Sequence, residues 1–244
     1  MPRAWFRFYA ELNDFLAPER RFVEFPYEFL DIGTVKDRIE SFGVPHTEVD
    51  LILVNGEAVD FAYRVRDGDR VSVYPMFEAL DIAPVARLRR EPLRDPRFVL
   101  DIHLGKLAAY LRMIGFDTLY RNCARDEELA AISRAERRIL LTRDVGLLKR
   151  GEVTHGYFMR ETWPRKQLAE VIRRFDLARL MRPFSRCMAC NAVLVEASKD
   201  SVRDALPERT AELYDEFRRC PACGRVYWKG GHYRRMMQMI ETYR

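Results

Sequence analysis

The sequence predicts an α/β protein of three modules, and three observations support this prediction. The first 78 residues hold short runs of alternating apolar and polar side chains around one amphipathic segment, which indicates a small mixed module. Between residues 98 and 182, apolar runs of strand length alternate with amphipathic segments, as in a doubly wound parallel sheet. Two Cys-x-x-Cys pairs follow in residues 183–244. Residues 79–97 are predicted to be a linker.

The first module, residues 1–78, has the predicted order ββαββ. Its predicted strands are residues 5–10, 21–25, 51–54 and 70–74. Thr34 and Asp37 have the spacing of a capping box at the start of a helix, and Gly43 is placed to end that helix. Asn55-Gly56 directly follows the third strand and favours a two-residue hairpin turn.

This order resembles the ubiquitin-like β-grasp proteins, in particular the small sulphur carriers. The resemblance rests on Leu53-Val54-Asn55-Gly56 and on the turn Asp67-Gly68-Asp69-Arg70-Val71. Sulphur carriers act through a C-terminal Gly-Gly, whereas the last strand here continues through residues 75–78 without one. The chain's Gly-Gly, residues 230–231, lies in another module. A docking or regulatory role is therefore expected for this β-grasp domain.

Charge is distributed unevenly along the chain. Residues 1–78 carry 9 Lys or Arg against 15 Asp or Glu, a net charge of −6, and residues 79–244 carry 33 against 22, a net charge of +11. A basic body is typical of proteins that bind nucleic acid, although charged faces can simply be solvated. The five arginines of the linker could likewise contact nucleic acid or simply be solvated. The acidic domain is expected to contact a protein partner or the basic body itself.

The sequence gives no indication of a membrane segment. No apolar run approaches the ~18 residues of a spanning helix. The first residues, Met1-Pro2-Arg3-Ala4-Trp5, lack the apolar core of a signal peptide. We therefore expect a cytoplasmic protein without a membrane partner.

Two apolar runs of the central region each lead to an aspartate. Residues 98–100 precede Asp101, and residues 139–142 precede Arg143 and Asp144. Ligands of parallel sheets bind beyond the carboxyl ends of the strands, so both aspartates are expected on one rim. Two converging carboxylates repel each other unless a cation lies between them, and oxygen ligands suit magnesium or manganese. The alternative is that both aspartates form turns where strands stop.

A third acid and two basic residues extend this candidate site. Asp126 is the first choice for the third acid, with Glu127 or Glu128 in reserve, although carboxylates also favour a helix start without any metal. Lys106 and Arg143 are candidates for phosphate contacts.

Several segments of this body resemble the Mut-seven C-terminal RNase family, a branch of the PIN-like nucleases. The segments are residues 98–101, 104–108, 111–112, 115–118 and 140–144. The resemblance implies a PIN-like nuclease domain at residues 98–182 that hydrolyses RNA phosphodiesters with a divalent metal, a zinc ribbon behind it and often a β-grasp domain in front. It implies Asp101 and Asp144 as ligands, with the intermediate acid on Asp126. Gly146 stands where PIN-like proteins often have a further acid. The alternative function is a non-catalytic RNA-binding or ribosome-associated adaptor.

The third module, residues 183–244, contains four cysteines with the spacing of a structural zinc site: Cys187, Cys190, Cys220 and Cys223. The 29 residues between the pairs exceed the usual roughly 15 to 20, so an insertion or helix is expected there. Two disulfides are the alternative. The fifth cysteine, Cys123, is expected to fill a small apolar space.

Basic and aromatic residues alternate after the second cysteine pair. The basic residues proposed to bind RNA are Lys229, Arg234 and Arg235. Tyr227, Trp228 and Tyr233 lie among them and could stack on unpaired bases or pack the small ribbon core.

Overall fold

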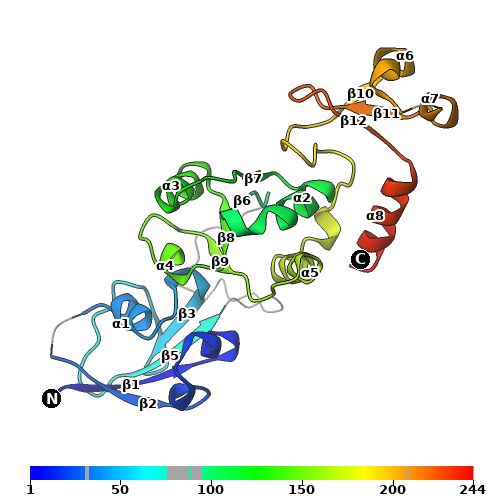
Figure 1. Cartoon of the computed structure of the whole chain (residues 1–244). Coiled ribbons are helices and arrows are strands. Elements are labelled where there is room, and N and C mark those ends of the chain that lie inside the picture. Colours follow the sequence, from blue (N-terminus) through cyan, green and yellow to red (C-terminus); the bar gives the residue numbers. More distant parts are fainter. Residues whose placement is uncertain (31–32, 76–87, 89–94, 208, 244) are drawn as a thin grey trace. The chain divides into compact units, whose positions relative to one another are not determined.

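The computed structural model describes residues 1–30, 33–75, 88, 95–207 and 209–243 (Figure 1). Most of the predicted linker, and the predicted continuation of the last strand through residues 76–78, lie outside the described residues. The chain divides into two compact units, residues 1–95 with 126–158 and residues 96–125 with 159–244. Residues of the predicted nuclease domain fall in both units. The predicted domain boundaries therefore stay a prediction. None of the described helices is long and apolar enough to cross a membrane.

The first unit contains a five-stranded mixed sheet with the order β2-β1-β5-β3-β4. Its strands are β1 (Arg3–Phe8), β2 (Phe25–Glu28), β3 (Val49–Val54), β4 (Glu57–Val59) and β5 (Arg70–Pro75). Its helices are α1 (Val35–Ser41) and the 3-10 turns η1 (Ala10–Phe15), η2 (Pro18–Arg20) and η3 (His46–Glu48). β1 pairs in parallel with β5, and the other pairs are antiparallel. The predicted ββαββ order is therefore correct apart from the added short strand β4.

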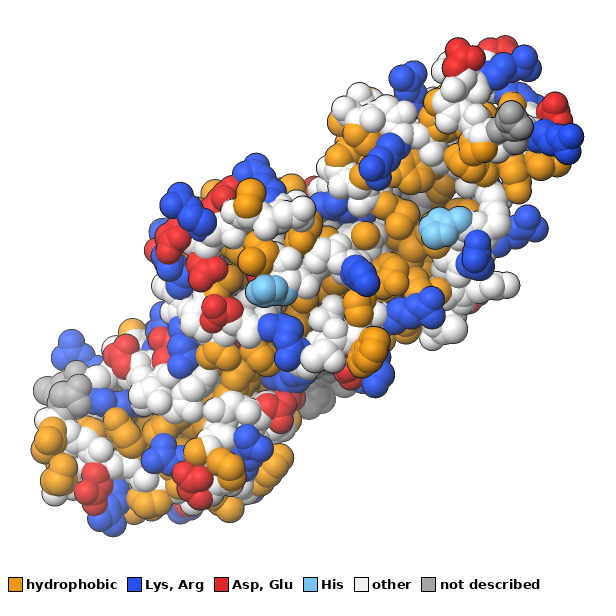
Figure 2. Space-filling model, in the orientation of Figure 1, with side chains coloured by type: hydrophobic (Ala, Val, Ile, Leu, Met, Phe, Trp, Pro, Cys, Tyr) orange, Lys and Arg blue, Asp and Glu red, His pale blue; other side chains and the backbone are white. Residues whose placement is uncertain are grey.

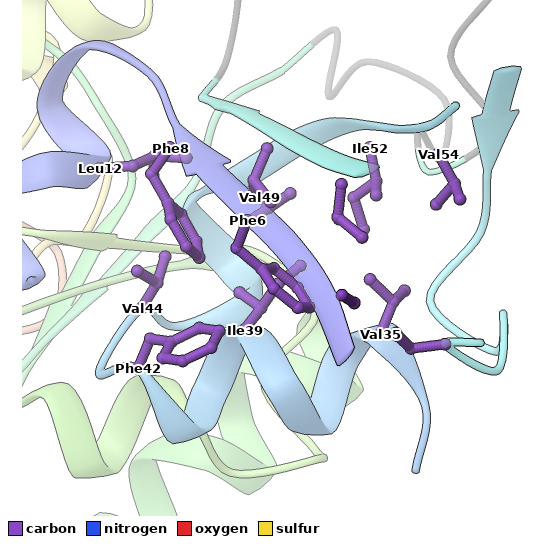
Figure 3. Close-up of a cluster of buried hydrophobic side chains, with 14 of the residues drawn as sticks. Phe6, Phe8, Leu12, Val35, Ile39, Phe42, Val44, Val49, Ile52 and Val54 are labelled. Atoms are coloured by element: carbon purple, nitrogen blue, oxygen red, sulfur yellow. The ribbon is translucent and has the colours of Figure 1, made fainter. Parts of the chain in front are cut away.

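Aromatic and aliphatic side chains together fill the core between α1 and this sheet (Figure 3). Phe6 and Phe8 of β1 are fully buried and meet the ring of Phe42 edge-on, with ring centroids 5.1 and 5.8 Å apart. The predicted capping box at Thr34 is present. The predicted hairpin turn is also present, since Asn55 and Gly56 both have positive φ angles.

The second strand begins later than predicted, at Phe25 instead of residue 21. Asn13 explains the difference. Its buried side chain donates to the carbonyl oxygens of Phe8 and Ala10 and accepts from the backbone N–H of Phe22. Phe22 is thereby held in the left-handed region, at φ +60°, where a strand cannot form.

The central region forms two parallel strand pairs with intervening helices. In the second unit β6 (Phe98–Leu100) pairs with β7 (Thr118–Tyr120), and in the first unit β8 (Ile139–Thr142) pairs with β9 (Gly156–Phe158). The helices are α2 (Gly105–Met113), α3 (Asp126–Glu136), α4 (Val145–Leu148) and α5 (Pro164–Arg174), with the 3-10 turns η4 (Ile102–Leu104) and η5 (Ala178–Leu180). Parallel pairing with helices between the strands confirms that part of the fold prediction.

The C-terminal region is a small antiparallel sheet followed by a helix. Its strands pair in the order β10 (Val195–Ala197), β11 (Phe217–Arg219) and β12 (Val226–Trp228). The helix α8 (Gly231–Glu241) follows β12. The long spacing between the cysteine pairs holds α6 (Lys199–Val202), η6 (Arg203–Ala205) and α7 (Thr210–Leu213). The predicted insertion is therefore confirmed.

The β-grasp domain binds the outer side of β9 through a buried carboxylate. Glu48 at the end of η3 is 1% exposed, and its Oε1 accepts the backbone N–H of Phe158 at 2.6 Å. The ring of Phe15 meets that of Phe158 edge-on. An N–H group that points away from the paired strand lies at the edge of the sheet and needs an acceptor. For the N–H of Phe158, Glu48 supplies this acceptor.

A second group of polar contacts lies beside the first. His46 contacts Glu40 Oε1 through Nδ1 at 2.7 Å and the carbonyl oxygen of Val153 through Nε2 at 2.9 Å. Lys149 donates to the carbonyl oxygen of Glu40 at 2.6 Å. Both ring nitrogens of His46 therefore have polar partners. The acidic domain thus contacts later residues of its own chain.

We expect Glu48→Ala to lower the free energy of unfolding by about 1–3 kcal/mol, because it leaves the N–H of Phe158 without its carboxylate acceptor. Chemical denaturation followed by circular dichroism measures the change. Glu57→Ala, at an exposed position on β4, is the matched control. Equal stability of the two variants would contradict the role given to Glu48.

Candidate functional site

Asp101 directly follows β6 and caps the short turn η4. Its carboxylate is 6% exposed, and Oδ1 accepts the backbone N–H of His103 at 2.6 Å. Tyr120, at the end of the neighbouring strand β7, donates its hydroxyl to the carbonyl oxygen of Ile102 at 2.9 Å. Gly105 gives this hydroxyl room, because a Cβ there would lie 2.7 Å from it. Tyr120 therefore helps to fix the turn that carries Asp101.

Asp144 follows β8 after one intervening residue and caps α4. Its Oδ1 accepts the backbone N–H groups of Gly146 at 2.6 Å and Leu147 at 3.2 Å. Thr142 holds the backbone N–H of Asp144 through its hydroxyl at 2.9 Å. Both strand-end aspartates therefore accept backbone N–H groups of the turns that follow their strands. The other carboxylate oxygen of Asp144 makes no hydrogen bond within the part of the chain that the structure describes.

Asp126 is exposed and begins α3, together with Glu127 and Glu128 in the first turn. Glu127 forms an ion pair with Arg150 at 3.2 Å. Asp126 belongs to the same unit as Asp144, whereas Asp101 belongs to the other unit. A site shared by all three carboxylates therefore stays a prediction.

The two predicted phosphate contacts are both exposed. Lys106 lies in the first turn of α2, a few residues after Asp101. Arg143 lies between β8 and Asp144. Each is therefore close in the chain to one of the candidate acids.

The four predicted zinc cysteines come together, and among the described residues they form the cluster that could hold a metal ion, with sulfurs within 4.8 Å of one another. The sulfurs of Cys187 and Cys223 lie 3.6 Å apart and those of Cys190 and Cys220 3.3 Å apart. Bonded sulfurs lie about 2.0 Å apart, so the disulfide alternative is wrong. Zinc with Zn–S bonds of about 2.3 Å would place tetrahedral sulfurs about 3.8 Å apart, which fits this cluster.

The thiols of the cluster differ in acidity. Burial raises the pKa of Cys187, but hydrogen bonds, above all from the Tyr227 hydroxyl at 3.1 Å, outweigh burial and lower this pKa to about 6. For Cys190 a backbone N–H lowers the pKa, while burial and the neighbouring thiols raise it to about 12 overall. Thiols packed this closely cannot all ionise without a cation, which is the condition that a metal ion satisfies.

The two cysteine pairs have the same backbone geometry. Residue Asn191 follows the first pair and Gly224 the second, with φ angles of +73° and +74°. The N–H of each donates to the carbonyl oxygen of the first cysteine in its pair, Cys187 or Cys220. This turn directs both sulfurs of a pair to the same side, as a zinc ribbon requires.

A buried arginine joins the first cysteine pair to α2 and β7. Arg112 is 5% exposed, and its Nε donates to the carbonyl oxygen of Thr118 at 2.9 Å. Its Nη1 donates to the carbonyl oxygens of Met188 and Ala189, between the cysteines, at 3.2 and 2.8 Å. Burial lowers the pKa of Arg112, and the nearby thiols oppose this effect.

The side chain of Asn191 makes a second connection between the same parts. Its Nδ2 donates to Asp117 at 2.8 Å, and its Oδ1 accepts the N–H of Thr118 at 3.0 Å. Sequence analysis missed this network and that of Arg112, although both include residues of the segments that resemble the RNase family. The one indication of these networks in the sequence was Arg112, a charged residue on the apolar face of a predicted helix.

The basic and aromatic residues after the second pair have separate roles. Tyr227 packs against Cys187 and Leu194, and Tyr233 contacts the ring of Phe184, so both aromatic side chains pack within the ribbon region. Lys229 forms an ion pair with Glu216. The remaining predicted contacts, Arg234 and Arg235 on α8, are exposed.

The interpretation of Cys123 as an apolar filler is wrong. Its side chain is exposed. It lies in the turn between β7 and α3, where the chain is at the surface.

We expect Arg112→Met to lower the free energy of unfolding by about 2–4 kcal/mol, because three carbonyl oxygens lose a charged donor. Zinc transfer to a chromogenic chelator should also become faster. Arg225→Met, at an exposed position of the second pair, is the control. Wild-type stability and zinc release in Arg112→Met would refute the connecting role.

We expect Cys190→Ser to weaken zinc binding roughly 100-fold, since about 10 kcal/mol of binding shared by four thiolates is about 2.5 kcal/mol each. Metal analysis and chelator competition measure the loss. Cys123→Ser, which lies outside the cluster, should keep the zinc. Equal zinc content of both variants would argue against the site.

Two family models match the chain in an order that agrees with this architecture. The family model for the Mut7-C RNAse domain matches residues 96–240, and the model for Mut7-C ubiquitin matches residues 1–81. No curated protein matches the chain. Two solved structures, of H. volcanii small archaeal modifier protein 1 and of SAMP1 from Haloferax volcanii, each align with 32% of this chain at 16% identity and a TM-score of 0.26, covering 100% and 99% of their own chains. The RNAse-domain match covers more than half of the 244 residues, and the chain therefore belongs to the Mut7-C RNAse family, with that family's ubiquitin-like domain in front.

Proposed function

We propose that the protein is a divalent-metal-dependent ribonuclease that hydrolyses RNA phosphodiesters at a PIN-like carboxylate site. The match of residues 96–240 to an RNAse domain is the observation that carries the proposal. The positions of Asp101, directly after β6, and Asp144, two residues after the end of β8, support it, because ligands of such sheets bind beyond the carboxyl ends of the strands. The free thiols suit the reducing cytoplasm in which we expect the protein to act.

The candidate ligands fit a hard cation. Asp101, Asp144 and Asp126 offer oxygen donors only, which magnesium and manganese prefer. When bound, such an ion polarises a phosphoryl oxygen and makes water a better nucleophile. Glu127 is engaged with Arg150, which favours Asp126 as the third acid.

Basic residues would bind the substrate. Lys106 and Arg143 are exposed beside Asp101 and Asp144 in the chain and would contact phosphates. Arg234 and Arg235 of α8, with Lys229 in the ribbon, would extend this contact along the RNA. The four cysteines would hold a structural zinc ion, since four thiolates leave no open ligand position.

A non-catalytic RNA-binding or ribosome-associated adaptor is the second candidate. Both strand-end aspartates act as caps, and Gly146 replaces a possible further acid. Such an adaptor would bind RNA through the basic residues of the ribbon and make no metal-dependent product.

We expect Asp101→Asn to abolish RNA cleavage in manganese or magnesium while the protein keeps its fold. Asparagine retains the capping oxygen for the N–H of His103 but removes the negative charge that the cation needs. Incubation with mixed single-stranded and structured RNAs, followed by a denaturing gel, measures the loss.

The matched control is Asp200→Asn, a change in the first turn of α6. It should cleave as wild type does. Cleavage by a folded Asp101→Asn variant would exclude Asp101 from the site. The absence of cleavage by wild type would favour the adaptor.

A further inference from the structure

An exposed tryptophan stands at the start of α5. Trp163 precedes Pro164, the first residue of this helix, and its side chain is 70% exposed. A large aromatic side chain at the surface offers a flat face on which a ligand can stack. Trp163 is not part of the candidate acidic site or of the cysteine cluster described above.

The loop that carries Trp163 is rigidly built. The two carboxylate oxygens of Glu170 accept the backbone N–H groups of Arg160 and Glu161 at 2.9 and 3.0 Å. The buried side chain of Gln167 donates to the carbonyl oxygen of Glu161 at 2.9 Å, and its backbone N–H donates to that of Trp163 at 2.8 Å. The indole is therefore presented on a fixed support, which lowers the entropy lost on binding.

Basic residues follow Trp163 in the first turn of α5. Arg165 and Lys166 are exposed there, and one acid, the half-buried Glu161, precedes Trp163 by two positions. The acid of this helix, Glu170, directs both oxygens to backbone N–H groups. The hydroxyl of Tyr243, just after α8, donates to the carbonyl oxygen of Arg165 at 3.3 Å, which places the end of the chain beside this basic surface. On the face drawn in Figure 2, Lys and Arg side chains stand beside apolar ones over α5 and α8.

Trp163 and Asp101 both belong to the second unit. Asp101 lies between a strand and α2, and Trp163 lies directly before α5. The helices α2 and α5 pack against each other.

We propose that Trp163 is a stacking platform for an unpaired base of single-stranded RNA, with Arg165 and Lys166 binding the phosphates beside it. The inference rests on RNA being the substrate class of the proposed function. Exposed aromatic faces flanked by Lys and Arg bind single strands, because every base has a face to stack and every nucleotide a phosphate to neutralise. Paired bases cannot reach the indole, so the platform selects for unpaired RNA.

Binding is measured in the Asp101→Asn variant, so that cleavage does not consume the probe. Fluorescence anisotropy of a labelled oligouridine should show that adding Trp163→Ala weakens affinity roughly 5- to 150-fold. Trp163→Phe, which keeps an aromatic face, should lose less. Leu213→Ala is the matched control, because Leu213 is an apolar side chain that is 72% exposed. Affinity for duplex RNA should be the same in all variants.

Unchanged oligouridine affinity of Trp163→Ala would overturn the platform and favour a protein partner for the indole. An equal loss for duplex RNA would also overturn it, because stacking acts on unpaired bases. No binding by the parent variant would overturn the platform and the RNA proposal together. Trp163-dependent binding without cleavage by wild type would support the platform while refuting the nuclease.

Discussion

The structure of the second unit depends on the buried guanidinium of Arg112. A charged group is costly to remove from water unless its donors are bonded, and here the acceptors come from two different parts of the unit. Thr118 supplies one carbonyl oxygen from β7, and Met188 and Ala189 supply two from the first cysteine pair. Neither part satisfies Arg112 alone. Folding of the ribbon and packing of α2 are therefore coupled, and a metal ion bound at the cysteines would stabilise both.

This coupling changes the interpretation of the segments that resemble the RNase family. Asp117 and Thr118 lie within them, yet both bond to Asn191 of the first cysteine pair. Gly115 belongs to the same group, because its positive φ and its closeness to the carbonyl oxygen of Arg182 and to the Ser185 hydroxyl of the third module leave no space for a Cβ. These residues hold the ribbon against the body. The segments that resemble the RNase family therefore contain residues that join two modules, in addition to the acids proposed for catalysis.

Local patterns were predictable where a few neighbouring residues determine the backbone. The turn at Asn55-Gly56, the cap at Thr34 and the four-cysteine cluster all follow from short spacings, and all are present. The start of β2 was not predictable, because it depends on contacts of Asn13 with a residue nine positions away. At the candidate acidic site the sequence placed Asp101 and Asp144 after strands, but their capping bonds depend on loop geometry that composition does not specify.

The contact between Glu48 and Phe158 bears on why a small acidic domain precedes an RNAse domain. An exposed strand edge invites pairing with other chains, and proteins avoid this by covering the edge. Here the cover is a buried carboxylate of the β-grasp domain, with His46 and Lys149 completing the contact. Because burial of Glu48 depends on its hydrogen bonds, separating the domain from β9 would leave both a carboxylate and a strand N–H unsatisfied. The domain is therefore a structural part of its unit.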